Sequence, residues 1–70
     1  MKLKDVDFNS LKTGTTKTML YDKNNSVIIS DYIGEVLGKI EHLMDSQIKN
    51  TAYHLDYDDA SYIYVIWLEV

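Results

Sequence analysis

The residues of this sequence best suited to acid–base or metal chemistry are its two histidines, His42 and His54. Histidine titrates near neutral pH and is a common metal ligand. Each has a carboxylate nearby in the sequence, Asp45 and Asp56 respectively. The two histidines lack the spacing of a helical metal-ligand pair, and no serine, cysteine or second carboxylate stands where a nucleophile relay would need it. We therefore expect surface histidines, no catalytic residues and a protein that is not an enzyme.

The acidic run Asp56–Asp59 resembles the beginning of a calcium-binding loop, in which carboxylates alternate along the chain. Such a loop needs a glycine at its sixth position and a glutamate at its twelfth. Ser61 and Trp67 stand at those positions. We predict a solvated acidic turn instead, with no metal. No glycine-rich loop is present to hold a phosphate, so no cofactor is expected.

Aromatic side chains are concentrated near the C-terminus: of six tyrosines, four lie between Tyr53 and Tyr64, and Trp67 follows them. Tyrosine and tryptophan are typical anchors of protein interfaces because they bury a large area and keep a polar group. One helix cannot bury so many phenols with satisfied hydroxyls. The predicted partner-binding residues are Tyr53, Asp56, Tyr57, Asp58, Asp59, Tyr62 and Tyr64, joined by the acidic residues Glu35, Glu41 and Asp45.

Composition restricts the classes of function. Seventy residues predict one domain, residues 1–70, whose small core needs very good packing or self-association. The chain has no cysteine, its N-terminus lacks the apolar stretch of a secretory signal, and its longest apolar run is too short to span a membrane, so we expect a cytoplasmic protein.

The charged residues are unbalanced: the chain has eleven carboxylates, seven lysines and no arginine. This balance argues against direct binding of nucleic acid and favours a partner protein with a basic surface, such as a nucleic-acid-binding protein.

Periodicity predicts an α+β fold: a four-stranded antiparallel sheet of two hairpins, one main helix between the hairpins and a short N-terminal helical segment. Leu3, Val6, Phe8 and Leu11 would line the N-terminal segment, which Gly14 would end. The main helix, capped by Ser30 or Asp31, would have one apolar stripe made of Ile33, Val36, Leu37, Ile40, Leu43 and Met44.

Gly34 and Gly38 lie within this helical pattern, at the spacing that pairs helices in lipid. The segment is charged, so close packing of the helix on a sheet, or a helix boundary, explains the two glycines better than a helix dimer does. The sequence leaves open whether the helix begins before or after them.

The two hairpins have predicted registers. In the first, Leu20 lies opposite Val27 and Thr18 opposite Ile29. In the second, the predicted pairs are Tyr57 with Tyr62, Leu55 with Tyr64, Tyr53 with Ile66 and Thr51 with Leu68. The last strand is then apolar on both faces, since its second face carries Ile63, Val65 and Trp67 beside Ala52, His54 and Asp56 of the preceding strand. One helix covers one face, so the N-terminal segment or a partner must cover the other, and the sequence leaves open which face the helix takes.

The Leu-Lys-rich N-terminus, the stretch Thr15–Asn25 and the closing tyrosine-rich acidic hairpin follow one another along most of the chain. In this order they resemble small early proteins of Gram-positive phages and prophages. The resemblance implies a protein that binds and redirects or inhibits a host enzyme, as anti-CRISPR and similar counter-defence proteins do. It includes no catalytic motif, so no functional residue is carried over from it.

These observations lead to an expected function. The chain is predicted to be a small acidic module that binds a host protein and blocks it sterically or electrostatically, in the host cytoplasm if a phage encodes it. The alternative is a structural or assembly protein that forms a homodimer by burying Ile63, Val65 and Trp67 against their symmetry mates.

Overall fold

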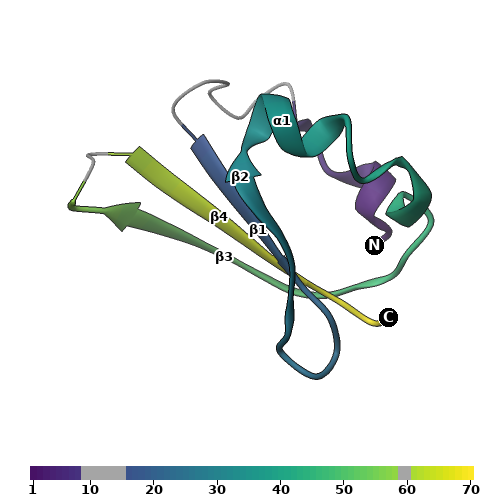
Figure 1. Cartoon of the computed structure of the whole chain (residues 1–70). Coiled ribbons are helices and arrows are strands. Elements are labelled where there is room, and N and C mark those ends of the chain that lie inside the picture. Colours follow the sequence, from purple (N-terminus) through teal and green to yellow (C-terminus); the bar gives the residue numbers. More distant parts are fainter. Residues whose placement is uncertain (9–15, 59–60) are drawn as a thin grey trace.

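The computed structural model describes residues 1–8, 16–58 and 61–70 of the chain, and it has the expected α+β architecture (Figure 1). Its elements are η1 (Leu3–Asp5), β1 (Thr16–Tyr21), β2 (Val27–Tyr32), α1 (Ile33–Leu37), η3 (Glu41–Leu43), β3 (Ile48–Asp56) and β4 (Ser61–Leu68). No helix among these described segments is long and apolar enough to cross a membrane.

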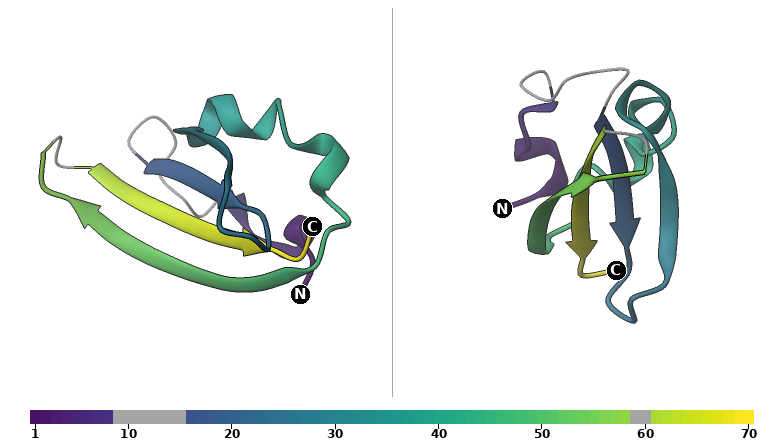
Figure 2. Two further views of the ribbon diagram at one scale, coloured as in Figure 1. Left: turned by 60° about the horizontal axis from the view of Figure 1, so that its bottom comes forward. Right: turned by 90° about the vertical axis from the view of Figure 1, so that its left-hand side faces the viewer.

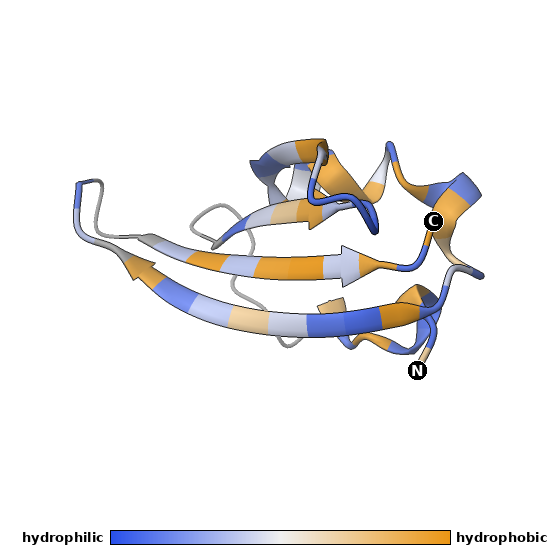
Figure 3. Cartoon of the chain, turned by 90° about the horizontal axis from the view of Figure 1, so that it is seen from below, coloured by the Kyte–Doolittle hydropathy of each residue, from blue (hydrophilic) through white to orange (hydrophobic). Residues whose placement is uncertain are grey.

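The four strands form one sheet in the order β2-β1-β4-β3, and this sheet is mixed. Both hairpins are antiparallel, as predicted, but β1 and β4 pair in parallel at the centre. The prediction of a purely antiparallel sheet was therefore wrong. The central strand β4 is orange or pale along its length in Figure 3, with no strongly hydrophilic residue.

The connection between the hairpins explains the parallel pair. From the end of β2 the chain runs through α1 and η3 across one face of the sheet before it begins β3. A connection that crosses a sheet in this way joins strands of the same direction. Because β2 and β3 run the same way, their hairpin partners β1 and β4 also run the same way, and their adjacency makes a parallel pair. Hydrophobic periodicity alone does not contain this information.

The register of the first hairpin differs from the predicted one. Leu20 pairs with Ile29 and Tyr21 with Val27, so Ile28 is an extra residue on β2. The turn explains this shift: the Asp22 amide donates to the Ser26 carbonyl at 2.9 Å, and Asn25 has a left-handed backbone with φ of 64°. This closed loop is longer than the predicted turn, and the extra residue forms a bulge.

The second hairpin is displaced from its predicted register by two residues. Leu55 pairs with Tyr62, Tyr53 with Tyr64, and Thr51 with Ile66. Side chains alternate between faces with a period of two, so a displacement of two residues leaves every side chain on its predicted face. The individual pairs were therefore wrong, but the assignment of residues to the two faces was right.

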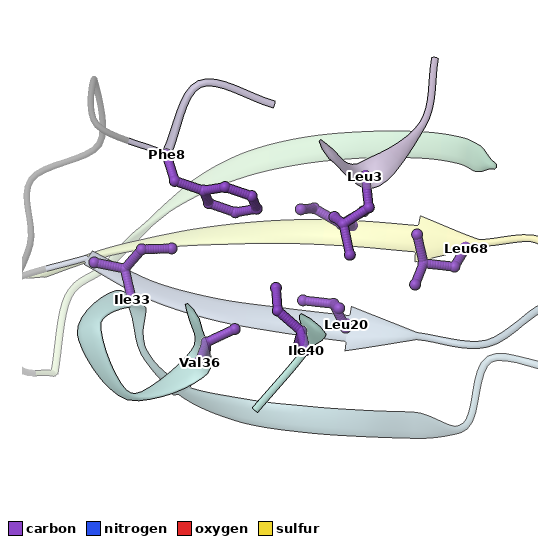
Figure 4. Packing of buried hydrophobic residues seen from close by; sticks show 8 residues of the cluster. Leu3, Phe8, Leu20, Ile33, Val36, Ile40 and Leu68 are labelled. Atoms are coloured by element: carbon purple, nitrogen blue, oxygen red, sulfur yellow. The ribbon is translucent and has the colours of Figure 1, made fainter. Parts of the chain in front are cut away.

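The core lies on one face of the sheet. Leu3 and Phe8 of the N-terminal segment and Ile33, Val36 and Ile40 of the segment that contains α1 meet there above the central strands (Figure 4). From the sheet side, the core contains Leu20, Ile66 and Leu68, each fully buried. Figure 1 shows that the N-terminal segment and α1 lie on the same side of the sheet. Residues 1–8, the described part of the N-terminal segment, therefore lie on the same face as α1 and not on the second face.

The helical segments differ from the predicted ones. The N-terminal one is interrupted, because the turn η1 ends at Asp5 and Val6 is extended, and Leu11 and Gly14 lie outside the described residues. The main helix starts after β2, which continues to Tyr32, and ends at Gly38, its C-cap. The predicted cap at Ser30 or Asp31 was therefore wrong, although the apolar stripe is buried or half-buried as predicted.

The two glycines of this segment do not serve close packing on the sheet. A Cβ atom at Gly34 would meet nothing within 4 Å, and one at Gly38 would meet only the Glu35 carbonyl oxygen, at 3.9 Å. Gly38 instead marks the end of α1. Of the alternatives considered for the glycines, a helix boundary is the correct one for Gly38.

Candidate functional site

The hairpin of β3 and β4 extends past the part of the sheet that α1 covers (Figure 2). On its covered side the Tyr53 ring stacks on the Tyr62 ring, with centroids 5.2 Å apart, and meets the Tyr64 ring edge-on at 5.8 Å. Tyr53 is 51% exposed and Tyr62 42%, while Tyr64 is half-buried beside the core. Of the four tyrosines predicted to share a face, Tyr53, Tyr62 and Tyr64 therefore form one cluster, and Tyr57 lies beyond the end of β3.

Two further large side chains are exposed on the same hairpin. Leu55 pairs with Tyr62 and is 41% exposed, and Tyr57 follows the end of β3 and is 87% exposed. We call Tyr53, Leu55, Tyr57 and Tyr62 the hairpin patch. A run of large apolar side chains on one exposed hairpin is typical of a surface that binds another protein.

The acidic residues of the predicted site fall into two groups. Asp58 is exposed in the turn beside Tyr57. Asp56 ends β3, but its side chain, like Asp59 as a whole, lies outside the described residues. In the described part of the hairpin end, one exposed carboxylate, that of Asp58, follows the exposed Tyr57.

The second group does not belong to the hairpin. Glu35 lies on α1, Glu41 lies on η3, and Asp45 follows η3, just before the start of β3. The hairpin patch lies at the other end of β3, and Figure 2 shows the η3 region and the tip of the β3–β4 hairpin at opposite ends of the molecule. The structure therefore does not bring Glu41 and Asp45 to the tyrosines.

Asp45 is also paired within the chain. Its carboxylate lies 3.1 Å from the ammonium group of Lys4. The hydrogen bond from Lys4 and the positive charges of Lys4 and Lys2 lower the pKa of Asp45. Both side chains are largely exposed, so solvent screens this pair. Asp45 therefore links the N-terminal segment to the chain that follows η3, rather than contributing a free carboxylate to a binding surface.

A second candidate surface lies on the opposite face of the sheet. Ile63, Val65 and Trp67 of β4 lie there, as predicted, beside Met19 and Tyr21 of β1. Within the described residues no helix or loop covers this face, which is turned toward the viewer on the right of Figure 2. We call these five residues the uncovered patch. Sequence reasoning missed Met19 and Tyr21, because their place depends on the parallel pairing of β1 with β4.

The side chains of the uncovered patch shield one another. Val65 is only 6% exposed, and the other four are half-buried. The Tyr21 ring stacks on the Trp67 ring at 5.8 Å. The ammonium group of Lys17 lies 5.6 Å from the centre of the Tyr32 ring at one side of the patch. The face is thus a flat aromatic and aliphatic layer with a basic margin.

The histidines form no common site. His42 is exposed on η3, and His54 is exposed on β3, on the side of the uncovered patch. Residues 1–8, 16–58 and 61–70 contain no group of three side chains suited to hold a metal ion, and they enclose no pocket. The candidate sites of the described residues are therefore exposed surfaces.

Comparison of the chain with protein families, with curated proteins and with solved structures returned no match.

Proposed function

We propose that this chain is a protein-binding module that recognises its partner with the hairpin patch. The stacked pair of Tyr53 and Tyr62 supports this proposal most directly, because the two large rings lie against each other while about half of each side chain remains exposed. Rings that are ordered before binding lose little conformational entropy when a partner covers them. Such tyrosines are typical hot spots of protein interfaces.

The charge of the hairpin supports a basic partner. Asp58 stands beside Tyr57 in the turn, and Asp56 and Asp59 stand next to them in the sequence. A basic surface would be attracted by these carboxylates and then held by the aromatic side chains. Together with the resemblance to phage early proteins, this supports a phage-type modulator that blocks a basic site on a host protein.

The proposal is tested by capture followed by a binding titration. The immobilised full chain is exposed to a Gram-positive bacterial lysate, the captured protein is purified, and its affinity is measured by calorimetry for the wild type and for Tyr57→Ala. Tyr57 is 87% exposed, so its removal should leave the fold intact. We expect binding weaker by a factor of about 10 or more, the loss typical of an interface anchor.

The control variant is Tyr32→Ala. Tyr32 is also exposed, but it lies on β2, at the opposite edge of the sheet from β3. Its substitution should leave the affinity unchanged. Equal binding by wild type and Tyr57→Ala, or a lysate that repeatedly yields no captured protein, would refute the proposal. Unchanged capture after charge reversal at Asp56, Asp58 and Asp59 would remove the electrostatic part alone.

A second candidate function is assembly of a homodimer through the uncovered patch, which is the alternative function predicted from the sequence. Val65 supports it, since a nearly buried valine at the centre of a bare face indicates a continuous apolar layer. Two such faces could pack together as sheet-on-sheet layers about 10 Å apart. Light scattering tests this candidate: Ile63→Lys should convert an oligomer to a monomer, whereas a wild type that is monomeric at micromolar concentration would contradict it.

A further inference from the structure

The hydrogen bonds at the end of the sheet determine which residues of β3 face its free edge. The Glu69 amide donates to the Gln47 carbonyl at 2.9 Å, so residue 69 directs its backbone toward β3. The N–H and C=O groups of successive residues point alternately to the two sides of a strand. The backbone groups of Ile63, Val65 and Trp67 therefore also point toward β3. Their pairing partners there are His54, Ala52 and Asn50 respectively. The intervening residues Thr51, Tyr53 and Leu55 therefore direct their N–H and C=O groups outward.

The outer edge of β3 is closed only at its beginning. Lys2 forms a bridge with Gln47, and the Ile48 amide donates to the Met1 carbonyl at 2.8 Å. Farther along, the side-chain oxygen of Asn50 accepts from the Thr51 amide at 2.8 Å. No strand among the described segments pairs with the outer edge at Tyr53 and Leu55. Unpaired edges of this kind are templates for another strand.

The other edge of the sheet is better protected. On β2 the extra residue Ile28 interrupts the regular pairing. The Asp31 carboxylate accepts from the Tyr32 amide at 2.8 Å and so occupies a donor near the end of that strand. Bulges and charged side chains are devices that prevent edge-to-edge pairing. By contrast, residues 51–55 include no lysine, carboxylate or proline.

The charges along β3 indicate which strand fits its edge. Lys49 stands near its start, beside the bridge formed by Lys2, whereas Asp56 ends it and Asp58 follows. A second copy of β3 laid antiparallel would bring the basic start of each strand to the acidic end of the other. Parallel pairing would place like charges together, which is destabilising. The edge is therefore electrostatically complementary to itself in the antiparallel direction.

We propose that two copies of this chain pair through their β3 edges, antiparallel and about a two-fold axis at Tyr53. Thr51 of each copy then lies opposite Leu55 of the other, and the outward amides and carbonyls of all three residues gain partners, with Asn50 releasing the Thr51 amide. The sheet continues from one copy into the next. This proposal goes beyond the function proposed above, since it concerns a second copy and needs no other partner.

The pairing has a consequence for the hairpin patch. A two-fold axis perpendicular to the sheet keeps the covered sides of both copies on the same side. The two Tyr53 residues would be directly opposite, about 5.5 Å apart between Cα atoms. The two hairpin patches then meet at the axis and form one aromatic surface, to which each copy contributes half.

Sedimentation analysis of a charge-swapped pair of variants tests the proposal. Wild type should form dimers with a dissociation constant on the order of 0.1 mM, as expected for a small interface. Tyr53→Lys and Tyr53→Asp each place like charges opposite each other at the axis, and each should be monomeric. An equimolar mixture of the two variants should regain dimers, which also shows that both variants are folded.

Two results of the sedimentation experiments would oppose the proposal. A wild type that stays monomeric up to about 1 mM, well above the expected constant, would overturn it. Dimers that persist in Tyr53→Lys would overturn it too, and their loss in Ile63→Lys would assign them to the uncovered patch. Hydrogen exchange requires no variant: the Tyr53 and Leu55 amides should become protected as the concentration of wild type rises. None of these measurements includes the host partner, so a negative result leaves the proposed host binding standing.

Discussion

The Tyr21 ring stacks on the Trp67 ring across the parallel strands β1 and β4, with centroids 5.8 Å apart and planes inclined by 16°. The two residues are directly opposite in the register of this central pair. Both are half-buried although no described segment covers their face. The stack therefore stabilises the junction of the two hairpins from the uncovered side, while the core stabilises it from the other.

A double-mutant cycle should detect this stack. Tyr21→Ala and Trp67→Ala should each reduce the free energy of unfolding, and the coupling between them should be about 0.5–1.5 kcal/mol, the usual range for aromatic pairs. Urea unfolding followed by far-ultraviolet circular dichroism measures all four proteins without relying on the tryptophan signal. The exposed Tyr57→Ala variant is the control. Strictly additive losses would show that the two rings contribute independently.

The parallel junction is also where prediction from the sequence reached its limit. Alternation identified the strands and the two faces of β4, because a buried position recurs every second residue whatever the partner strand is. It could not identify the partner, so Tyr21 was not expected beside Trp67. The neighbours of a strand depend on how the intervening chain crosses the sheet, which is a property of the whole fold.

Turn geometry limited the prediction in a different way. The left-handed backbone of Asn25 and the hydrogen bonds from the Asn24 and Ser26 amides to the Asp22 carboxylate lengthen the first turn and shift the register of its hairpin. The hydrophobic periodicity of the sequence does not predict this shift. In the second hairpin a displacement of two residues left the faces intact, so Tyr53 and Tyr62 were correctly placed together. The sequence thus predicted which residues share a face of the sheet better than it predicted which residues pair across the two strands. Glu41 and Asp45, which the sequence analysis joined to the surface of these tyrosines, lie on and just after η3, away from the tyrosines, and the sequence pattern could not show this because their positions depend on the tertiary fold.

Gly34→Ala should stabilise the chain. Gly34 lies inside α1, and an added Cβ would meet nothing within 4 Å. Alanine restricts the unfolded chain and favours the helix, so the free energy of unfolding should rise by about 0.5–1 kcal/mol. Thermal unfolding measures this change, and sedimentation of the same variant should show an unchanged oligomeric state. An altered oligomeric state would instead revive the interpretation of Gly34 and Gly38 as a helix-pairing motif.

The ion pair of Lys4 and Asp45 predicts that the stability of the fold decreases at low pH. Lys4 lowers the pKa of Asp45 in the folded chain below its ordinary value, roughly 3.9. The folded state therefore favours the ionised carboxylate. The contribution of this pair to the free energy of unfolding is fully present above the pKa that Asp45 has in the unfolded chain, and it is lost as the pH falls through the lower pKa of the folded chain. A carboxyl-detected NMR titration should show the Asp45 pKa returning toward its ordinary value in Lys4→Gln. The Lys39→Gln variant, which alters the separate pair with Asp31, is the control.

Thr18→Val should also stabilise the chain, for a reason specific to its place in the core. Thr18 is fully buried on β1, and within the described residues its hydroxyl oxygen has no hydrogen-bond partner. A buried hydroxyl without a partner is unfavourable by about 1–3 kcal/mol, and valine has nearly the same shape. We therefore expect the free energy of unfolding to rise by about 1 kcal/mol or more.

Urea unfolding of Thr18→Val is compared with that of Thr51→Val, whose side chain is exposed on β3 and should change stability little. A loss of stability in Thr18→Val would contradict the prediction and would mean that the hydroxyl makes a hydrogen bond in solution. The outcome bears on the proposed surfaces as well. A gain would provide a more stable chain, with the hairpin patch and the uncovered patch unaltered, in which to measure substitutions such as Tyr53→Lys and Ile63→Lys.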